Sequence, residues 1–319
     1  MTRHVALVGP TASGKSALAL AIARSAGDVE IVSLDSMQVY RGLDIGTAKP
    51  TRADRSEVVH HLVDVAEPSE EWSVQRTQEA ARAALADIES RGRRALLVGG
   101  TGLYVRAVVD DLEIPPTDQS VRDRLDRDVE SDEGLTRGYA RLTELDPSAA
   151  VRIEPGNRRR IVRALEVIEL TGRRFSSFGP GIDEYPAPAI SVTMLGLRFI
   201  PTELGERIAA RFATMRRAGL VDEVRSLADL PSDQSMSRTA REAIGYRELL
   251  AHFAGDIPAL DDAFDAAVRR TRRFARRQRT WFGRDPRVVW IDGTQTATDL
   301  AGDALRVWRD SQPAVVAVP

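Results

Sequence analysis

A glycine-rich loop directly behind a short apolar run is the feature that most constrains the fold. Residues 9–16 match the pattern G-x-x-x-x-G-K-[ST] at every fixed position, between the apolar run Val5–Val8 and the alanine-rich residues 17–24. A strand, a glycine loop and a helix in this order form a cradle of backbone N–H groups for a di- or triphosphate. We therefore predict a phosphate-binding loop, or P-loop. Its predicted diphosphate-binding residues are Gly9, Pro10, Thr11, Ala12, Ser13, Gly14, Lys15 and Ser16.

Two side chains of this loop have specific chemistry. Lys15 would place a point charge beside the phosphates, and the hydroxyl of Ser16 would be a ligand of Mg²⁺. Of the 45 basic residues only Lys15 and Lys49 are lysines. Against such a strong arginine bias, a retained lysine indicates a position that needs a compact ammonium group. The same argument applies to Lys49, which lies in an expected loop.

The first hundred residues alternate between strand-like and helix-like segments. This alternation predicts a parallel sheet with helices on both faces. Ligands of such sheets bind beyond the carboxyl ends of the strands, so the P-loop, Asp35 and Gly99–Gly102 should lie at one edge. The strands predicted here are Val5–Val8, Glu30–Leu34 and Arg94–Val98, and the helices are Ser16–Ser25 and Val74–Arg91.

The middle of the chain differs from both of its ends. After a proline-rich linker, residues 120–171 are charged and helical, and Phe175–Pro188 is rich in glycine and proline. We predict a P-loop α/β core domain of residues 1–114 and 186–319, into which a small all-helical domain of residues 115–185 is inserted. The later elements predicted for the core are the strands Ser191–Leu197 and Val288–Ile291 and the helices Glu203–Ala218, Leu220–Ala228, Arg238–Ala251 and Leu260–Trp281.

Composition excludes several classes of site. The chain has no cysteine, which excludes disulfides, thiolate metal sites and a cysteine nucleophile. No apolar run approaches about 18 residues, so we expect no membrane span. The first residues, Met1–Val5, lead into a strand without the apolar region of a signal peptide. We expect a monomer in the cytoplasm.

The strand that ends in a magnesium-binding acid in nucleoside-triphosphate hydrolases has no such acid here. Ala95–Val98 is followed by Gly-Gly-Thr, and only Ile31–Leu34 is followed by an acid, Asp35. Asp35 therefore either serves the metal or carries out other chemistry beside the phosphates. A contact with a ribose is a third interpretation, because Asp35 follows the loop by about 20 residues, but the loop does not read G-x-G-x-x-G.

Further polar groups follow the ends of these strands. The residues after Asp35 are Ser36, Met37 and Gln38. An amide such as that of Gln38 can pair with the edge of adenine, and the neighbouring acid can accept a proton from an amine. The alternative is that the acid or the serine only caps a helix. Thr101, between two glycines, either offers its hydroxyl and N–H to a phosphate or forms a tight turn.

Two basic segments indicate a nucleic-acid partner. Residues 269–284 contain eight arginines and no acid, and Phe274, Gln278 and Trp281 share one stripe of the expected helix. A basic helix with aromatic neighbours suits an RNA backbone and unstacked bases. Residues 157–165 form a second basic segment. Salt bridges to acids elsewhere in the fold are the rival explanation.

One more pair of arginines has the spacing to meet the phosphates. Arg207 and Arg211 lie four residues apart in the predicted helix Glu203–Ala218. Residues at this spacing share a helix face, so either guanidinium could reach the P-loop. The alternative is that both are ordinary surface arginines.

These segments together resemble the bacterial tRNA dimethylallyltransferases. The matching motifs run nearly from end to end of the chain, and their combination is far more specific than a P-loop alone. The chain departs from the family before Asp35, where it has Ser-Leu instead of the more usual Ser-Ala. The motifs are Gly-Pro-Thr-Ala-Ser-Gly-Lys-Ser (9–16), Asp-Ser-Met-Gln-Val-Tyr (35–40), Asp-Ile-Gly-Thr-Ala-Lys-Pro (44–50), His-His-Leu-Val-Asp (60–64), Gly-Gly-Thr-Gly-Leu-Tyr (99–104), Arg-Arg-Ile-Val-Arg-Ala-Leu-Glu-Val (159–167), Ala-Ile-Gly-Tyr (243–246) and Arg-Arg-Gln-Arg-Thr-Trp-Phe (276–282).

The resemblance implies transfer of a dimethylallyl group from dimethylallyl diphosphate to N6 of an adenine. This adenine lies just 3′ of the anticodon, in tRNAs that read codons beginning with U, and is flipped out of its stack. Asp35 would be the general base on the exocyclic amine. The other expected catalytic residues, Lys15, Thr101 and Arg211, would stabilise the departing diphosphate together with Thr11 and Ser16, and Mg²⁺ would be the cofactor.

The implied macromolecular partner is the anticodon stem-loop of tRNA. Both the family resemblance and the basic helix contribute to the set of expected contacts. The residues expected to contact tRNA are Asp35, Ser36, Met37, Gln38, Thr101, Arg122, Arg159, Arg160, Arg163, Arg272, Arg273, Arg276 and Arg277.

Two other functions would use the same features differently. A small-molecule or nucleoside kinase would bind ATP at the P-loop and would have no use for the arginine-rich helix. A non-catalytic RNA-binding module would leave Lys15 and Asp35 without a role.

Overall fold

The computed structural model of the chain describes residues 3–179 and 184–310. The glycine- and proline-rich loop predicted at Phe175–Pro188 is therefore described only in part, because residues 180–183 lie outside the described residues. The first two and last nine residues of the predicted core domain also lie outside them.

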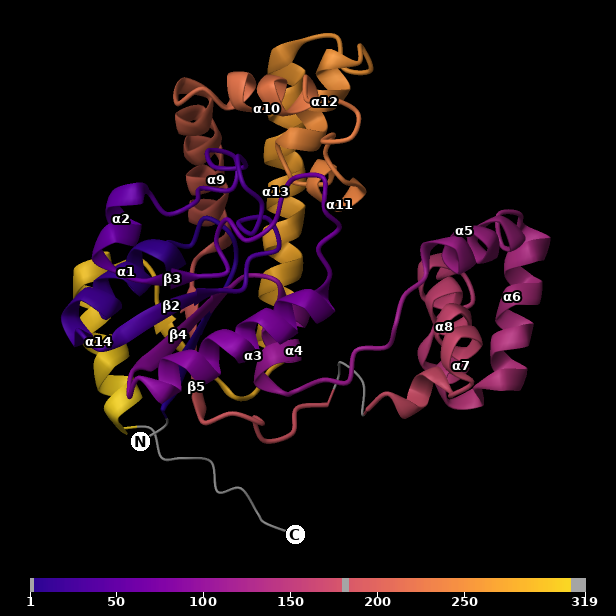
Figure 1. Ribbon diagram of the computed structural model, residues 1–319, viewed down its shortest axis with the longest axis horizontal. Coiled ribbons are helices and arrows are strands. Elements are labelled where there is room, and N and C mark those ends of the chain that lie inside the picture. The colour runs from indigo at the N-terminus through magenta and orange to yellow at the C-terminus, as the bar shows by residue number, and fades with distance from the viewer. Residues whose placement is uncertain (1–2, 180–183, 311–319) are drawn as a thin grey trace. The chain divides into compact units, whose positions relative to one another are not determined.

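The chain divides into two compact units (Figure 1). The core unit comprises Met1–Asp111 and Ala187–Pro319, and the insertion unit comprises Leu112–Pro186. The core domain predicted from the sequence ends at residue 114 and resumes at residue 186. The divisions lie close to these positions, at 111 and 187.

The core unit is built on a six-stranded sheet in which every pairing is parallel. The strand order is β3-β2-β4-β1-β5-β6. The five strands other than the short β3 coincide with the predicted strands to within a residue or two. The strands are β1 (His4–Val8), β2 (Val29–Ser33), β3 (His60–His61), β4 (Arg94–Gly99), β5 (Val192–Arg198) and β6 (Val288–Asp292).

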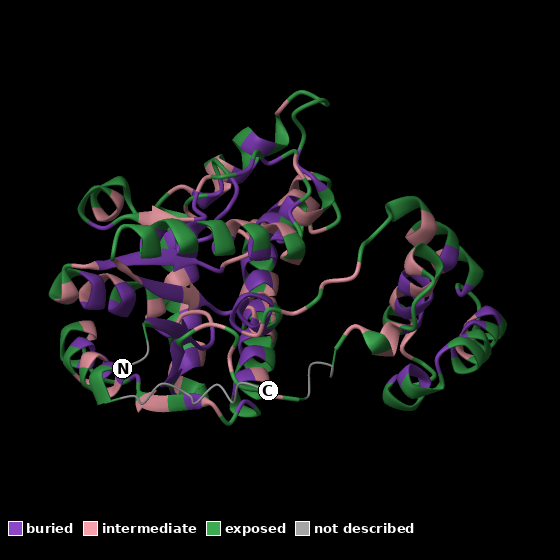
Figure 2. Cartoon of the chain, turned by 60° about the horizontal axis from the view of Figure 1, so that its bottom comes forward, coloured by how far each residue is buried: buried purple, intermediate pink, exposed green. Residues whose placement is uncertain are grey.

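Helices cover both faces of this sheet, and their buried sides face it (Figures 1 and 2). The helices of the core unit are α1 (Lys15–Ala26), α2 (Arg52–Glu57), α3 (Val74–Ser90), α4 (Gly102–Val109), α9 (Pro201–Arg217), α10 (Leu220–Ala228), α11 (Arg238–Arg241), α12 (Tyr246–Phe253), α13 (Leu260–Gly283) and α14 (Ala297–Asp310). Alternate residues of β1 point to opposite faces. Val5 and Leu7 join one apolar core with α1 and α14, whereas Ala6 and Val8 join the other with α3 and α4.

The helix predicted over Arg238–Ala251 is wrong in one respect, because it is two helices. Residues 242–245 separate α11 from α12, and Gly245 has a φ of 98°. The Gly245 N–H donates to the carboxylate of Glu248 at 2.8 Å, which begins the second helix. Helices α2, α4 and α14 were also not predicted.

The insertion unit is a bundle of short helices around a separate apolar core. Helix α8 contributes Ile161 and Leu165, which cluster with Leu125 and Leu142. The described part of this unit contains no strand, so the predicted α/β fold with an inserted helical domain is confirmed. Its helices are α5 (Gln119–Asp128), α6 (Asp132–Leu145), α7 (Pro147–Arg152) and α8 (Arg158–Thr171), followed by the 3₁₀ helix η1 (Phe175–Ser177).

Side-chain caps explain where these helices begin. Asp118, Ser131, Asp146 and Asn157 each accept a hydrogen bond from a backbone N–H of the first turn that follows. Such caps satisfy donors that have no partner within the helix. Across residues 3–179 and 184–310, no helix is both long and apolar enough to cross a membrane.

A buried ionic network lies at the carboxyl end of α4, where the chain is about to leave the core. Asp110 is fully buried and accepts hydrogen bonds from Arg106 Nε at 2.5 Å and from Arg287 Nη1 at 2.6 Å. Arg287 also pairs with Asp285, just before β6. Each charge in this network is therefore compensated within the core.

Candidate active site and nucleic-acid surface

The P-loop joins the carboxyl end of β1 to the first turn of α1. Its backbone is left-handed at Gly9, Ala12 and Gly14, with φ values of 142°, 63° and 85°. Glycine adopts such angles without steric cost, but alanine does not. The backbone of Ala12 is therefore strained, and the rest of the loop must hold it in this conformation. Helix α1 begins at this loop, and its N-cap residue Gly14 provides no side-chain cap; the N-terminus of a helix at such a loop is the arrangement that binds anions.

Three of the four predicted catalytic residues interact electrostatically at this loop. Burial lowers the pKa of Lys15 to about 7, Asp35 opposes that shift, and Arg211 adds to it. Burial also lowers the pKa of Arg211, again opposed by Asp35. The Lys15 ammonium donates to the Pro10 carbonyl at 2.6 Å. One carboxylate thus interacts with two basic groups, so the site has an excess of positive charge for an anion whenever Lys15 is protonated.

We expect diphosphate binding to be coupled to proton uptake by Lys15. Its pKa of about 7 leaves the amine mostly neutral near pH 8, and a bound anion would raise this pKa and restore the charge. The affinity of the wild-type protein for inorganic diphosphate with Mg²⁺ should therefore fall as the pH rises above about 7. Calorimetry in two buffers of different ionisation enthalpy measures the uptake. Lys15→Arg, which cannot lose its proton in this range, is the control, and equal proton uptake by both proteins would contradict the prediction.

Asp35 is oriented by the backbone that follows it. Its Oδ1 accepts from the N–H of Met37 at 2.8 Å and of Gln38 at 3.3 Å. The helix cap considered as an alternative is absent, because residues 36–39 form a turn and no helix begins there. Asp35 instead stabilises this turn, and it uses only one carboxylate oxygen to do so. No hydrogen bond to Oδ2 is found within the described part of the chain, so this oxygen is available to a substrate.

The amide of Gln38 is occupied within the protein. Its Oε1 accepts from Ser33 Oγ at 3.0 Å, and its Nε2 donates to the carbonyls of Thr47 and Ala48 at 3.2 and 3.3 Å. These bonds hold the loop after Asp44 against the end of β2. The predicted contact of Gln38 with tRNA stays a prediction, and the structure adds a positioning role. Ser36 and Met37 are partly exposed beside it.

Lys49 has a structural role. Its side chain is 3% exposed, and its ammonium contacts the Tyr40 carbonyl, Asp44 Oδ1 and Asp64 Oδ1, each at 2.6 Å. A compact ammonium group with three donors fits this buried position. The two lysines of the chain therefore lie at different places, Lys15 in the P-loop and Lys49 in a buried structural position.

Arg207 and Arg211 of α9 both lie beside the P-loop region. Arg211 donates to the Thr47 carbonyl at 3.4 Å. The Arg207 guanidinium stacks on the ring of Phe199, 4.7 Å from its centroid, and lies 3.5 Å from where a Cβ at Gly14 would be. The sequence left open whether Arg207 reaches the loop, and its position beside Gly14 makes it a third basic group there, with Lys15 and Arg211.

Thr101 begins α4 without using its hydroxyl as a cap. The residue is partly exposed, and its hydroxyl has no hydrogen bond with another described residue, so the hydroxyl is available to a ligand. Tyr104, one turn later, was not selected from the sequence. Burial raises its pKa to about 12, with further contributions from Tyr40 and Asp35. Tyr104 therefore belongs to this site, and its place in the Gly-Gly-Thr-Gly-Leu-Tyr motif was the only sequence signal for it.

Helix α13 packs directly on both loops of the site. The Thr11 N–H donates to Gln278 Oε1 at 2.8 Å, and Gln278 Nε2 donates to the Gly100 carbonyl at 2.7 Å. A Cβ at Gly102 would lie 2.0 Å from the ring of Trp281. The glycines after β4 are therefore needed because α13 approaches so closely.

Comparisons with known proteins agree with this geometry. A sequence model described as IPP transferase matches residues 38–285, and one described as isopentenyl transferase matches residues 2–64. A tRNA dimethylallyltransferase of Salinispora arenicola is 48% identical over 305 residues, which is 96% of this chain and 86% of that protein. One of Corynebacterium glutamicum is 46% identical over 307 residues, 96% of this chain and 99% of that protein. The chain belongs to the tRNA dimethylallyltransferase family.

Solved structures agree with this assignment. The tRNA isopentenylpyrophosphate transferase of Bacillus halodurans has a TM-score of 0.67 at 36% identity, with 97% of this chain and 98% of that chain covered. A eukaryotic dimethylallyltransferase acting on tRNA has a TM-score of 0.78 at 25% identity, with 100% of this chain and 82% of that chain covered. The protein is therefore a prenyltransferase that modifies tRNA, and the kinase alternative is not favoured.

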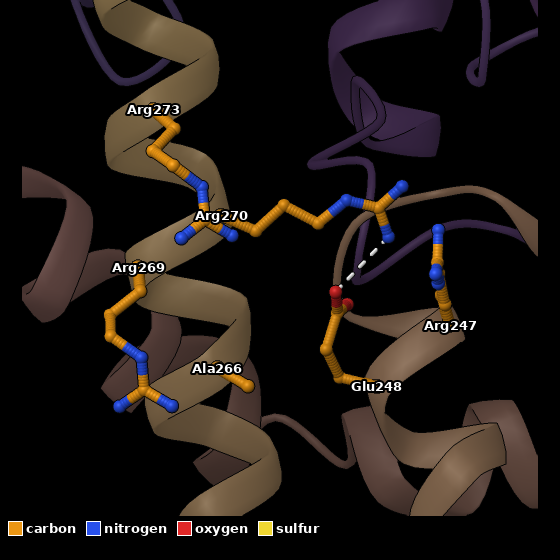
Figure 3. A pocket seen from close by; sticks show the side chains of 6 residues that line it. All are labelled: Arg247, Glu248, Ala266, Arg269, Arg270 and Arg273. Atoms are coloured by element: carbon orange, nitrogen blue, oxygen red, sulfur yellow. Dashed lines mark hydrogen bonds and ion pairs between the residues drawn. The ribbon is translucent and has the colours of Figure 1, made fainter. Parts of the chain in front are cut away.

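In this transferase the arginines of α13 divide into two groups. Arg270 pairs with Glu242 and Glu248, so the rival explanation of internal salt bridges applies to it. Arg273, Arg276 and Arg277 are exposed and have no ion pair with any described residue. Figure 3 shows the pocket between α12 and α13, where Arg269 and Arg273 project beside the Arg270–Glu248 pair. Arg272, also predicted to contact tRNA, is exposed and donates to the Gly205 carbonyl at 3.2 Å.

The arginines predicted in the insertion unit divide in the same way. Arg122 and Arg163 both pair with Glu166, which is buried. Arg163 also donates to the carbonyls of Pro115 and Pro116 at 2.8 Å each. Arg163 therefore holds the linker against α8, and Arg122 joins α5 to α8 through Glu166. Arg159 and Arg160 are exposed without an ion pair in the described part of the unit.

Proposed function

We propose that this chain transfers the dimethylallyl group of dimethylallyl diphosphate to N6 of the adenine just 3′ of the anticodon. The tRNAs would be those that read codons beginning with U. The observation that supports this most directly is the grouping of Lys15, Asp35 and Arg211 at the P-loop. That grouping offers cations for a diphosphate and a carboxylate with one free oxygen for an amine.

The reaction couples one bond that forms to one that breaks. The adenine nitrogen attacks the first carbon of the prenyl group, the bond between that carbon and the diphosphate oxygen breaks, and Asp35 accepts the proton from the exocyclic amine. Negative charge grows on the departing diphosphate. Lys15, Arg211 and the free hydroxyl of Thr101 stabilise this charge where it develops.

Mg²⁺ is the proposed cofactor, bound together with the diphosphate. Residues 3–179 and 184–310 contain no group of three or more histidine, aspartate or glutamate residues that could hold a metal, so most ligands would come from the substrate. The exposed hydroxyl of Ser16 fits the protein's share, and the buried Ser13 Oγ lacks a partner in the described structure. When bound, Mg²⁺ would neutralise charge on the diphosphate.

The proposed macromolecular substrate is the anticodon stem-loop of tRNA, bound by a monomer in the cytoplasm. The exposed arginines of α13, and Arg159 and Arg160 of the insertion unit, offer positive charge to its phosphates. Ser36 and Met37, partly exposed beside Asp35, would line the position of the flipped adenine.

A labelling assay tests this proposal. The protein is incubated with labelled dimethylallyl diphosphate, Mg²⁺ and unmodified tRNA that has adenine 3′ of its anticodon. We expect label in that adenine and none in a tRNA with guanine at the same place. Transfer that needs ATP, or no transfer under conditions where a known family member is active, would refute the proposal.

Neutralising the unpaired arginines of α13 should weaken tRNA binding and reduce its salt dependence. In a variant with Arg273→Gln, Arg276→Gln and Arg277→Gln, the slope of log affinity against log salt should fall by about 2 to 3 units. A matched control removes three other exposed charges, with Arg52→Gln, Arg217→Gln and Arg309→Gln. If both variants change the slope equally, α13 is not a specific RNA surface.

A further inference from the structure

We propose that Gln278 is a positioning residue for the prenyl donor, because its amide clamps the P-loop to the Gly99–Gly102 loop. The inference rests on the proposed function of the P-loop as the diphosphate site. It gives α13 a second role on its buried face, separate from the arginines that it exposes.

The side-chain amide of Gln278 spans the two loops with both of its polar atoms. Its Oε1 accepts the Thr11 N–H at 2.8 Å, and its Nε2 donates to the Gly100 carbonyl at 2.7 Å. The orientation of the amide is set by this chemistry, because an N–H needs an oxygen and a carbonyl needs a donor. The side chain is buried, so water does not offer replacement partners.

Close packing leaves the clamp little freedom to move. A Cβ at Gly100 would lie 2.4 Å from Gln278 Nε2, and a Cβ at Gly102 would lie 2.0 Å from the Trp281 ring. One helical turn of α13 thus fills the space above both glycines. The helix and the two loops must therefore keep one relative position.

The clamp has a direct consequence for the phosphate cradle. The Thr11 N–H is bound to Gln278, so it is not one of the amides that face the diphosphate. The bond instead fixes the loop just before Ala12, whose φ of 63° is strained. Without the amide, the loop can relax from this conformation. Its remaining N–H groups and the Thr101 hydroxyl would then no longer be held in position to bind the same diphosphate.

Two variants of Gln278 and one control test the proposal on the full-length chain. Gln278→Glu keeps the size and the acceptor for Thr11 but places an oxygen against the Gly100 carbonyl. Gln278→Ala removes both bonds. The control is Thr280→Ala, two residues later. Among the described residues, its exposed hydroxyl bonds only to the Arg276 carbonyl of its own helix, at 3.1 Å. The measurements are binding of inorganic diphosphate with Mg²⁺, the KM for dimethylallyl diphosphate, the affinity for tRNA and the unfolding temperature.

We expect both Gln278 variants to weaken diphosphate binding and to raise the KM for dimethylallyl diphosphate by about tenfold or more. An effect of this size is expected when one buried hydrogen bond is lost. Affinity for tRNA should stay within about twofold of wild type, because Gln278 is buried beneath the RNA-facing side of α13. Thr280→Ala should match wild type in every measurement.

The outcomes separate this inference from the function on which it rests. Wild-type protein that binds no diphosphate would refute the proposed site itself. Folded Gln278 variants with wild-type diphosphate affinity would refute the clamp, and so would a loss confined to tRNA binding. If Gln278→Ala does not fold, Gln278→Glu decides, because it preserves the packing volume.

Discussion

Replacing Asp35 by asparagine should lower the rate of dimethylallyl transfer by about 10²- to 10⁴-fold, the usual contribution of a general base. Asparagine keeps an oxygen that can accept from the N–H of Met37 and Gln38, so the loop should keep its shape. It cannot accept the proton of the adenine amine. Single-turnover rates with saturating tRNA and dimethylallyl diphosphate measure the effect on chemistry alone.

Binding measurements distinguish this loss from a structural one. The affinity of Asp35→Asn for tRNA should stay within about threefold of wild type, since one rim contact contributes little. Ser56→Ala is a control away from the site, because its exposed hydroxyl donates to the Ala53 carbonyl of its own helix. A single-turnover rate of Asp35→Asn within about fivefold of wild type would remove Asp35 from the role of base.

Replacing Asp110 by asparagine should lower the free energy of unfolding by about 3 kcal/mol or more, as when one partner of a buried ion pair is removed. Asp110 is fully buried and bonds to Arg106 and Arg287, of which Arg106 is itself 1% exposed. Asparagine retains the volume but leaves two guanidinium groups without their shared counter-charge. Urea denaturation followed by circular dichroism measures the change.

The adjacent residue provides a matched control for this substitution. Asp111 pairs with Arg82 at the surface, where its side chain is 55% exposed. Asp111→Asn should cost less than about 1 kcal/mol, because exposed ion pairs contribute little. Equal effects of the two substitutions would show that the buried network does not stabilise the core as we infer.

Local patterns in the sequence were sufficient to predict most of the architecture. The P-loop at residues 9–16 depends on spacing within eight residues, and the strands and helices beside it depend on the period of apolar residues. The inserted helical unit was visible for the same reason, because the alternation of strands and helices stops at the linker. The break between α11 and α12 was missed, since it depends on Gly245 and on its bond to Glu248.

Local sequence patterns predicted the chemistry of the site only in part. Lys15 and Asp35 each follow a strand, and strands of one parallel sheet end at the same edge, so their meeting could be expected. The sequence could not show which arginines form ion pairs within the protein and which do not. Arg122 and Arg163, which had been predicted to meet tRNA, turn out to pair with Glu166.

The sequence by itself determined that this chain has a P-loop, a parallel sheet, an inserted helical unit and the motifs of its family. Tertiary structure alone decided that Lys49 is buried, that Arg207 lies beside Gly14, and that Gln278 joins two loops of the site. Thr11 and Gln278 are 267 residues apart in the chain. Periodicity and spacing report on neighbours along the chain, whereas the partner of a buried polar group is set by whichever element the fold brings against it.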